Sequence, residues 1–503
     1  MLRVHNSLSR QLEVLEPAEP GHVRMYVCGM TVYDYCHIGH ARAMLTFDVV
    51  YRHLQHRGYK VTYVRNHTDV DDKIIARANE LGEHPLALSE RFIQALDEDL
   101  GALGLRKPTI EPKVSDNIDG IIALNQKLVD RGHAYAVDGD LYFDVTSYED
   151  YGKLSGRKLE DLRAGERVAV DTRKQHPGDF ALWKAAKPEE GLDWASPWGR
   201  GRPGWHIECS VMSMKHLGES FDIHGGGIDL LFPHHENEIA QSECGTGCKP
   251  FSKVWLHNGH LTLVETQADG EESEIKMSKS LGNVIRIRDI LKEVPHEALR
   301  LLYLGAHYRS PLPYSGDRLG DATGSLNRIY QAKESAQLIA AKPAKGKQPP
   351  EKLAKELGAE DLWALASDFT ERFNEAMDQD FNTAKAVGLL FELTRIINRL
   401  ANEKAAKKRG GPLFAKALEA YAVTADVLGI GGMEPADFFN ELKHKRIQSI
   451  GLDASWVEAR LEARLQARSE KDWAAADAIR DELLAQGVEV MDTAGGVDWR
   501  VRV

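Results

Sequence analysis

Residues 23–42 read VRMYVCGMTVYDYCHIGHAR, and this stretch decides the fold. Its first six residues alternate apolar and other side chains, as a short strand does. A loop containing Gly29 follows, and residues 38–57 then form a predicted helix that Gly58 ends. Further along, residues 61–64 predict a second strand and residues 71–81 a second helix that Gly82 ends. Strand, helix, strand and helix at these spacings predict a parallel sheet covered by helices.

The rest of the chain changes character several times. Clusters of Gly and Trp punctuate residues 116–200, with one predicted strand at 140–145, so we interpret this part as an insertion in the sheet domain. From residue 308 long helical patterns rich in Ala, Leu, Glu and Lys predict a helical bundle to about residue 432, interrupted by an exposed linker at 342–350. Residues 433–503 predict a small separate unit with helices at 455–468 and 472–486 and a terminal hairpin pairing 488–490 with 499–501.

Composition limits the classes of protein that fit. The 503 residues are 43% hydrophobic and 28% charged, an ordinary globular mixture. The net charge of −12 argues against a protein that coats nucleic acid nonspecifically. No apolar run approaches the roughly 18 residues of a membrane span, and the start does not resemble a secretory signal. We therefore expect a cytoplasmic protein without a membrane contact, whose five cysteines form no disulfide framework.

A histidine motif lies where the first loop passes into a helix. His37 and His40 flank Gly39, at a helix N-terminus whose unpaired N–H groups and dipole favour anions. Two imidazoles one turn apart can donate to phosphate oxygens, and Gly39 leaves room for a flat ring to approach the backbone. Taken alone, the motif is equally well explained as a pair of surface histidines.

A second motif supplies lysines. Residues 276–280 read KMSKS, so Lys276 and Lys279 with two serines offer mobile cationic and hydroxyl donors for a polyphosphate. An ordinary solvated basic loop is the alternative for this motif alone. The two motifs occur in this order about 240 residues apart. This pairing resembles the class I aminoacyl-tRNA synthetases, in which the two signatures bind ATP and stabilise adenylate formation.

The resemblance implies a fold and a reaction. It implies an α/β Rossmann-like parallel-sheet catalytic domain with an insertion, followed by an α-helical bundle and a small C-terminal α+β domain. The expected boundaries are 1–115 and 201–262 for the two catalytic halves, 116–200 for a connective insertion, 263–307 for the KMSKS loop and stem-contact region, 308–432 for a tRNA-binding bundle and 433–503 for an anticodon-recognition domain. His37, Gly39, His40 and Lys279 would bind ATP, accompanied by magnesium, and His37, His40, Lys276 and Lys279 would be catalytic. No general base is needed, because the amino-acid carboxylate is already ionised.

A third group of residues has the chemistry of a metal site. His234 and Glu238 are four residues apart and share a helical face, Cys209 lies 25 residues before His234, and Cys28 ends the first strand. Zinc takes such ligands in a tetrahedron. Spacing alone does not select this quartet, because other thiols and imidazoles compete for the site. The competitors are Cys244 with Cys248 as a Cys-x-x-x-Cys pair, and His206, His224 and His235.

The segments around these residues resemble cysteinyl-tRNA synthetases. They are residues 25–29 (MYVCG), 204–210 (GWHIECS), 221–227 (FDIHGGG) and 232–238 (FPHHENE). The resemblance implies one zinc ion per chain, bound by Cys28, Cys209, His234 and Glu238, that binds the substrate thiolate at the base of the amino-acid pocket. It also implies that Thr68, Trp205 and His224 line this pocket. Cys36, Cys244 and Cys248 fall outside these segments, and we expect them to be ordinary thiols.

Zinc in the pocket has an independent rationale. Serine differs from cysteine by one atom, and an apolar pocket separates such near-isosteres only about 10–200-fold. Zinc prefers a soft thiolate and deprotonates a coordinated thiol, so it can reject serine without an editing domain. The short insertion at 116–200 agrees with the absence of editing. Asp69, Asp71 and Asp72 could be a magnesium site, but we favour a helix N-terminal acidic cluster.

The C-terminal unit points to an RNA partner through the family resemblance. Arg460, Arg464 and Arg468 recur every four residues and could follow an RNA backbone, although interleaved glutamates favour a solvated face. Residues 467–481 and 492–500 nevertheless resemble the anticodon-reading module of bacterial cysteinyl-tRNA synthetases. Trp473 and Trp499 are then core anchors or base-stacking platforms, and we expect Trp473 in the core.

These observations predict an ATP-dependent ligase, with L-cysteine, ATP and tRNA(Cys) as partners and a monomeric state. One alternative is a cysteine ligase of mycothiol synthesis, which resembles the same catalytic core but lacks the C-terminal module. A second is a non-catalytic zinc-dependent RNA-binding or sensor protein, against which the intact phosphate-binding motifs argue. A third is a zinc hydrolase, but that class keeps one coordination position for water, whereas this quartet fills the tetrahedron with protein ligands.

Overall fold

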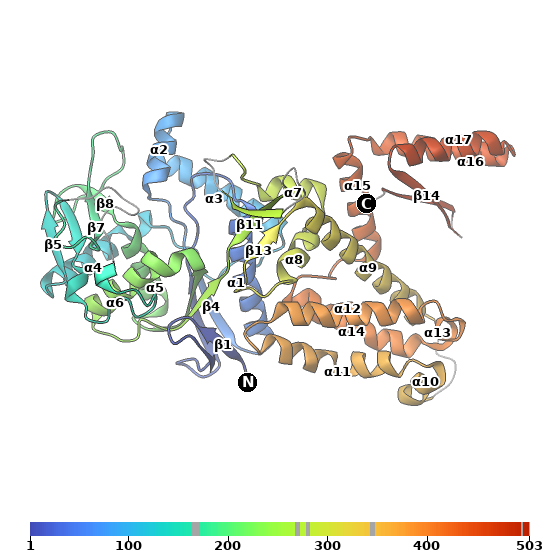
Figure 1. Cartoon of the computed structure of the whole chain (residues 1–503), viewed down its shortest axis with the longest axis horizontal. Coiled ribbons are helices and arrows are strands. Elements are labelled where there is room, and N and C mark those ends of the chain that lie inside the picture. Colours follow the sequence, from blue (N-terminus) through green and yellow to red (C-terminus); the bar gives the residue numbers. More distant parts are fainter. Residues whose placement is uncertain (162–171, 267–271, 278–281, 343–347, 494–495, 502–503) are drawn as a thin grey trace.

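The centre of the protein is a four-stranded parallel sheet in the order β10-β9-β3-β4 (Figure 1). The computed structural model describes residues 1–161, 172–266, 272–277, 282–342, 348–493 and 496–501. The four strands are β3 (His22–Val27), β4 (Lys60–Arg65), β9 (Phe221–Gly227) and β10 (Ser252–Asn258). They confirm the predicted parallel sheet.

The order of the strands indicates at which end of the sheet ligands bind. Helix α1 (Ile38–His56) carries the chain from β3 to β4, while β9 and β10 lie on the other side of β3. Gly58, with φ of +86°, adopts a left-handed conformation just beyond α1, as predicted from the sequence. Because the strand order reverses beside β3, ligands are expected to bind beyond the carboxyl ends of β3 and β9, as they do in such sheets.

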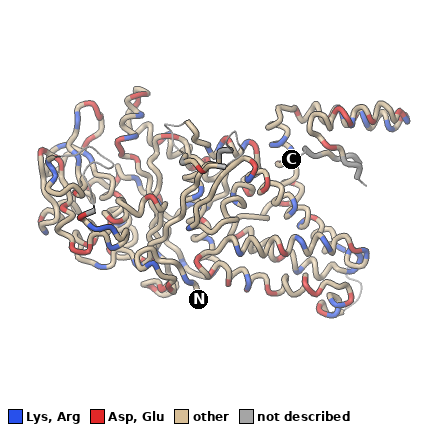
Figure 2. The backbone as a smooth tube through the Cα atoms, in the orientation of Figure 1, with Lys and Arg blue, Asp and Glu red and all other residues tan. Residues whose placement is uncertain are grey.

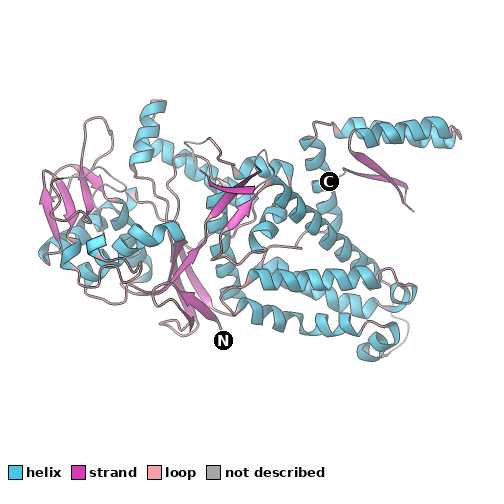
Figure 3. Ribbon diagram, in the orientation of Figure 1, coloured by secondary structure: helices cyan, strands magenta, loops and turns pink. Residues whose placement is uncertain are grey.

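A second sheet lies mostly within the predicted insertion at 116–200, although its last strand begins at residue 201. Helices α2 (Asp72–Leu81), α3 (Pro85–Ala102) and α4 (Ile118–Asp130) follow β4. An antiparallel sheet then forms in the order β5-β6-β7-β8, at the far end of the molecule from the bundle (Figure 3). Its strands are β5 (Ala134–Val137), β6 (Asp140–Phe143), β7 (Phe180–Ala185) and β8 (Gly201–Pro203).

Two further helices and two small sheets surround the central sheet. Helices α5 (Trp205–Leu217) and α6 (Glu236–Thr246) precede β9 and β10 respectively. The strand β11 (Leu261–Thr266) pairs with β12 (Glu272–Lys276) and with β13 (Leu312–Tyr314). At the N-terminus β1 (Arg3–Asn6) and β2 (Gln11–Val14) form a hairpin.

The helical bundle shares one hydrophobic core with the sheet domain. Phe47 of α1 and bundle residues such as Leu390 and Phe414 belong to the same buried cluster. Arg300 links the two parts, because its Nη2 donates to Asp48 Oδ2 of α1 and its Nε donates to Leu428 O of the bundle, both at 2.9 Å. The helices from here onward are α7 (Ile287–Glu293), α8 (His296–Leu304), α9 (Gly316–Ala340), α10 (Pro350–Leu357), α11 (Glu360–Met377), α12 (Thr383–Leu400), α13 (Lys404–Arg409) and α14 (Gly411–Val427).

The C-terminal unit has a core of its own. It is joined through α15 (Pro435–Ser449) and contains α16 (Ala454–Ser469), α17 (Trp473–Ala485) and the hairpin of β14 (Val488–Thr493) and β15 (Gly496–Val501). Figure 1 shows α16, α17 and β14 standing apart from the bundle. The predicted hairpin is confirmed, with Val490 opposite Trp499. Its separate cluster contains Ile447, Val457, Leu461, Leu483, Val488 and Trp499.

Charge is mixed over most of the molecule. Figure 2 shows acidic and basic residues interspersed along the backbone of the sheet domain, the bundle and the C-terminal helices. Within the described residues, no helix combines the length and the apolar composition that a bilayer crossing requires.

Candidate active site and metal centre

The four predicted metal ligands meet at the carboxyl end of the sheet. Cys28 follows β3, Cys209 lies on α5, and Glu238 lies on α6, one turn after His234 in the short helical segment η5 (Leu231–His235). All four side chains are buried, and one potential ligand atom from each lies within 4.8 Å of the others. Chain segments up to 210 residues apart in sequence thus converge on one buried pocket.

The distances between these atoms fit tetrahedral zinc. The sulfurs of Cys28 and Cys209 are 3.7 Å apart, and Cys28 Sγ lies 3.6 Å from Glu238 Oε1. Two sulfurs bound at about 2.3 Å in a tetrahedron would be about 3.8 Å apart, and a sulfur and a carboxylate oxygen about 3.5 Å. His234 Nε2 lies 3.0 Å from Glu238 Oε1, against about 3.3 Å in the ideal tetrahedron. The residues present therefore fit a zinc ion.

A second set of ligands overlaps the first. Cys28 and Glu238 also lie within reach of His224 and His235. Cys28 Sγ is 3.4 Å from His235 Nε2, and His224 Nε2 is 2.8 Å from Glu238 Oε2. Because the two sets share two residues, they belong to one pocket. The set with two thiols is the softer donor group, which favours Cys209 and His234 for zinc.

Charges inside this pocket are strongly coupled. Burial opposes ionisation of Cys209, but hydrogen bonding with Cys28 and the proximity of His234 outweigh it and lower the pKa of its thiol to about 6. Burial likewise opposes ionisation of His234, yet Glu238 and Cys209 raise its pKa to about 10. For Glu238, burial is outweighed by His224 and His234, and the pKa falls to about 2. Thiolate and carboxylate together draw positive charge to the centre of the pocket.

A histidine cluster lies behind the ligands. His234 Nδ1 is 3.0 Å from Nδ1 of His206, and His235 Nδ1 is 2.8 Å from Nε2 of His257. These contacts fix the ring orientations from behind, as partners of metal-binding histidines do. Sequence reasoning missed His257. Its signal is position, because it is the last residue but one of β10, opposite Gly226 of β9, and therefore reaches the same sheet edge.

The three predicted pocket residues lie around this centre in different ways. Trp205 is 38% exposed, and its ring stacks on His234 at 4.3 Å between centroids. Thr68 is buried and accepts a hydrogen bond from Asn66 Nδ2 at 3.1 Å. His224 is fully buried, stacks on Trp255 and contacts Glu238, so it meets the centre through that carboxylate.

One glycine lets the two neighbouring strands approach. A Cβ on Gly29 would lie 1.7 Å from the carbonyl oxygen of Asn66, so no side chain fits there. The N–H of Gly29 donates to Asn66 Oδ1 at 2.9 Å. This contact holds the loop after Cys28 against the segment that carries Thr68.

The histidine motif begins α1 beside this pocket. His37 is the N-cap, and its Nδ1 accepts hydrogen bonds from the N–H groups of Gly39 at 3.1 Å and His40 at 3.3 Å. With Nδ1 accepting, the proton of the neutral ring is on Nε2. The rings of His37 and His40 stack with centroids 3.5 Å apart. The motif thus combines helix capping with a paired imidazole face.

The lysine motif comes close to the histidine motif. Lys276 ends β12, its side chain lies outside the described residues, and so does the whole of Lys279. Met277 Cε lies 3.2 Å from the place of a Cβ on Gly39. Just beyond the motif, the N–H of Ile38 donates to Ile285 O at 3.0 Å and that of Ile287 to Cys36 O at 3.1 Å. The chain that follows the lysine motif is therefore paired directly with the start of α1.

Two further expectations concern the aspartates before α2 and the cysteines outside the ligand group. Asp71 and Asp72 lie at the N-terminus of α2, as favoured from the sequence, whereas Asp69 accepts hydrogen bonds from Ser115 instead. Three cysteines, Cys36, Cys244 and Cys248, are free thiols and belong to no ligand group among the described residues.

Two expectations about the C-terminal unit are wrong. Trp473 is 60% exposed rather than in the core, because it begins α17, and the residues of that helix that reach the core, Ile479 and Leu483, lie further along. Trp499 is buried beneath Lys443, whose Nζ lies 3.9 Å from the ring centroid. The arginine stripe is not one solvated face either, because Arg464 is buried.

Three family models match this chain, and together they cover most of its length. The model for the catalytic domain of class I (C) tRNA synthetases matches residues 14–324, the DALR domain matches 372–430, and the cysteinyl-tRNA ligase anticodon binding domain matches 454–500. Among solved structures, methionyl-tRNA synthetase of Mycobacterium tuberculosis in complex with methionyl-adenylate is 14% identical, covers 86% of this chain and 94% of its own, and has a TM-score of 0.59. The fold and the paired motifs are those of a class I aminoacyl-tRNA synthetase.

Full-length relatives narrow the family. The cysteine–tRNA ligases of Geobacter sulfurreducens and Syntrophotalea carbinolica are 48% and 50% identical to this chain, and each alignment covers 100% of both proteins. The chain belongs to the cysteine–tRNA ligase family.

Proposed function

We propose that this enzyme activates L-cysteine with ATP and transfers it to the 3′ end of tRNA(Cys), with selection of cysteine by a zinc ion on Cys28, Cys209, His234 and Glu238. The observation that carries the proposal is the meeting of two thiols, an imidazole and a carboxylate at tetrahedral spacing, at the sheet edge beside the paired histidines. Zinc bound there would hold the substrate as a thiolate, which serine cannot supply.

The first step, formation of the adenylate, needs hydrogen-bond donors and cations at the phosphates rather than a general base. Attack of the ionised cysteine carboxylate on the α-phosphorus of ATP forms cysteinyl-AMP and releases pyrophosphate, so negative charge builds on phosphoryl oxygens. His37 and His40 would donate to these oxygens from the N-terminus of α1, whose dipole adds to their effect. Lys276 and Lys279 would act on the opposite side, and magnesium would accompany the ATP phosphates.

The second step moves cysteine from the adenylate to the 2′-hydroxyl of the terminal adenosine, with AMP as the leaving group. Relatives that match the whole chain, together with the anticodon binding domain at 454–500, support tRNA as the acceptor. The same matches argue against the mycothiol alternative, which lacks that module. The exposed Trp473 supports a stacking contact with RNA near the anticodon. The expected monomeric state and cytoplasmic location stay predictions.

One exchange experiment tests the proposal. ATP–pyrophosphate exchange is measured with cysteine and with serine, on the wild type and on Cys209→Ser, and zinc content is determined for both. We expect exchange with cysteine only, and joint loss of exchange and zinc in the variant. A matched control is Cys244→Ser, a buried thiol outside the ligand group, which should retain both.

Two results would overturn the proposal. Absence of exchange in the wild type would contradict adenylate formation. Exchange that persists in a zinc-free Cys209→Ser variant, with cysteine still preferred, would contradict the role of the metal.

A further inference from the structure

The turn between α11 and α12 holds two residues in an unfavourable backbone conformation. Asp380 has φ of +59° and Phe381 of +49°, and neither is glycine. Such a conformation costs free energy and persists where surrounding contacts determine it. Both side chains are buried, so the contacts of this turn, residues 378–382, explain why it is held.

The carboxylate of Asp380 binds two other parts of the chain, the N-terminal strand β1 and the segment at 307–310. Its Oδ1 accepts hydrogen bonds from the N–H of His5 and the hydroxyl of Tyr308, both at 2.8 Å. Its Oδ2 accepts from Arg309 Nε at 2.7 Å. The backbone of the turn also pairs with β1, because Arg3 N donates to Asp378 O and Asp380 N to Arg3 O. Asp380 thus fixes the segment at 307–310 against the bundle.

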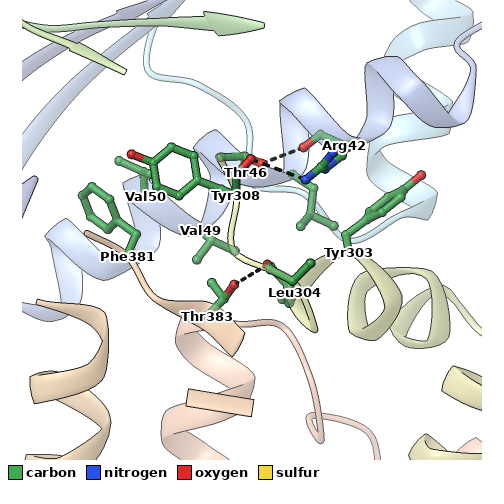
Figure 4. A pocket seen from close by; sticks show the side chains of 11 residues that line it. Arg42, Thr46, Val49, Val50, Tyr303, Leu304, Tyr308, Phe381 and Thr383 are labelled. Carbon is green, nitrogen blue, oxygen red and sulfur yellow. Dashed lines mark hydrogen bonds between the residues drawn. The ribbon is translucent and has the colours of Figure 1, made fainter. Parts of the chain in front are cut away.

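The same segment holds the N-terminal half of α1. Arg42 lies five residues after His37 and is buried, and its guanidinium donates to the carbonyls of Tyr308 and Ser310. It also donates to the carbonyls of Gly259 and His260, which follow β10. Figure 4 shows Arg42, Tyr308 and Phe381 around one small pocket between α1 and the bundle.

A second aspartate of the turn holds the other end of α1. Asp378 Oδ1 lies 3.0 Å from His53 Nε2 and 3.2 Å from Arg57 Nε. Arg42 and His53 are 11 positions apart, which is about 16 Å along a helix at 1.5 Å per residue. One turn of the bundle therefore fixes α1 at two points, directly at its end and through residues 307–310 near its start.

We propose that Asp380 is a positioning residue that sets the place of His37 and His40 at the ATP phosphates, through Tyr308, Arg309 and Arg42. The inference rests on the proposed function of this site. It also predicts a selective effect, because the cysteine pocket is built on β3, α5 and α6 and not on the attachments of α1. Loosening α1 should disturb ATP more than cysteine.

The test uses the full-length chain carrying Asp380→Asn, which keeps the shape and removes the charge. In cysteine-dependent ATP–pyrophosphate exchange we expect kcat/KM for ATP to fall about tenfold or more, because small misplacements of catalytic groups cost this much. The KM for cysteine should stay close to that of the wild type. The control is Asp361→Asn, which removes an aspartate contact with Arg399 inside the bundle and touches neither α1 nor residues 307–310, and both KM values should then be unchanged.

The possible results separate the inference from the proposed function. Wild type without exchange would refute the proposed function and the inference with it. The positioning role alone would be refuted if the wild type shows exchange and the Asp380→Asn variant keeps its kcat/KM for ATP. It would also be refuted if the variant loses affinity for ATP and for cysteine equally. If Asp380→Asn does not fold, Tyr308→Phe removes one hydroxyl donor and gives the same comparison, with a selective loss toward ATP expected.

Discussion

His37 performs two tasks, and substitution can separate them. Its Nδ1 caps α1 by accepting from Gly39 and His40, while the rest of the imidazole is proposed to face phosphate. Asparagine is among the best N-cap residues, whereas alanine caps poorly. We therefore predict that His37→Asn and His37→Ala lose the same catalytic contact but differ in stability.

The magnitudes follow from these contacts. Loss of one preorganised donor to a developing oxyanion costs about 10²–10³ in kcat, so both variants should show this decrease in ATP–pyrophosphate exchange. Loss of an N-cap costs about 1 kcal/mol, which only His37→Ala should show. In a chain of this size that difference shifts Tm by roughly 2 °C or less, so urea unfolding monitored in the catalytic domain is the better assay.

Two results would refute this reasoning. Exchange by His37→Asn within about threefold of the wild type would mean that the imidazole makes no important contact in the transition state, since a donor there is worth about 10²-fold. Equal unfolding free energies for the two variants would mean that the cap contributes nothing measurable. Cysteine binding, whose proposed pocket is not built on α1, serves as the control for a correctly folded pocket.

The other predictions concern single features of the structure. Gly29→Ala should lower the free energy of unfolding by at least about 3 kcal/mol or prevent folding, because its Cβ would overlap Asn66 O. Gly101→Ala, in open space on α3, should instead raise it by up to about 1 kcal/mol, as measured by urea unfolding. Burial lowers the pKa of His296 to about 4, so the unfolded chain takes up a proton first and stability falls as pH drops from about 6.5 to about 4. From pH 7 to pH 5 the free energy of unfolding should therefore fall by about 2 kcal/mol more in the wild type than in His296→Gln. An equal fall in the two proteins would contradict the pKa shift. Trp473→Ala should leave amino-acid activation unchanged and lower kcat/KM for tRNA about 10–100-fold, and equal aminoacylation by variant and wild type would show that this side chain makes no stacking contact.

Local signals in the sequence predicted much of the fold. Alternation and terminal glycines located β3, α1, β4 and α2 within one or two residues, because these signals act over one turn of chain. The C-terminal hairpin was predicted for the same reason. Trp473 was assigned to the core wrongly, because hydrophobicity at a helix start does not reveal whether another element covers it.

The metal centre was harder to predict from spacing. Cys28 and Cys209 are 181 residues apart, so their approach depends on strand order, which the sequence pattern did not specify. Spacing therefore left Cys244 and Cys248 as competitors, and the family resemblance made the choice. His257 and Asp380 were missed for a related reason, since each gains its contacts only when distant strands and helices assemble.

The separate core of the C-terminal unit has a kinetic consequence. Ile447, Leu483 and Trp499 belong to a cluster that, among the described residues, shares no member with the core of the sheet domain and the bundle, so this unit can open as a cooperative segment while the rest stays folded. Its fluctuations need not reach the pocket that would hold a reactive adenylate. If RNA binds this unit as proposed, it can be contacted and released there while the proposed adenylate pocket keeps its structure.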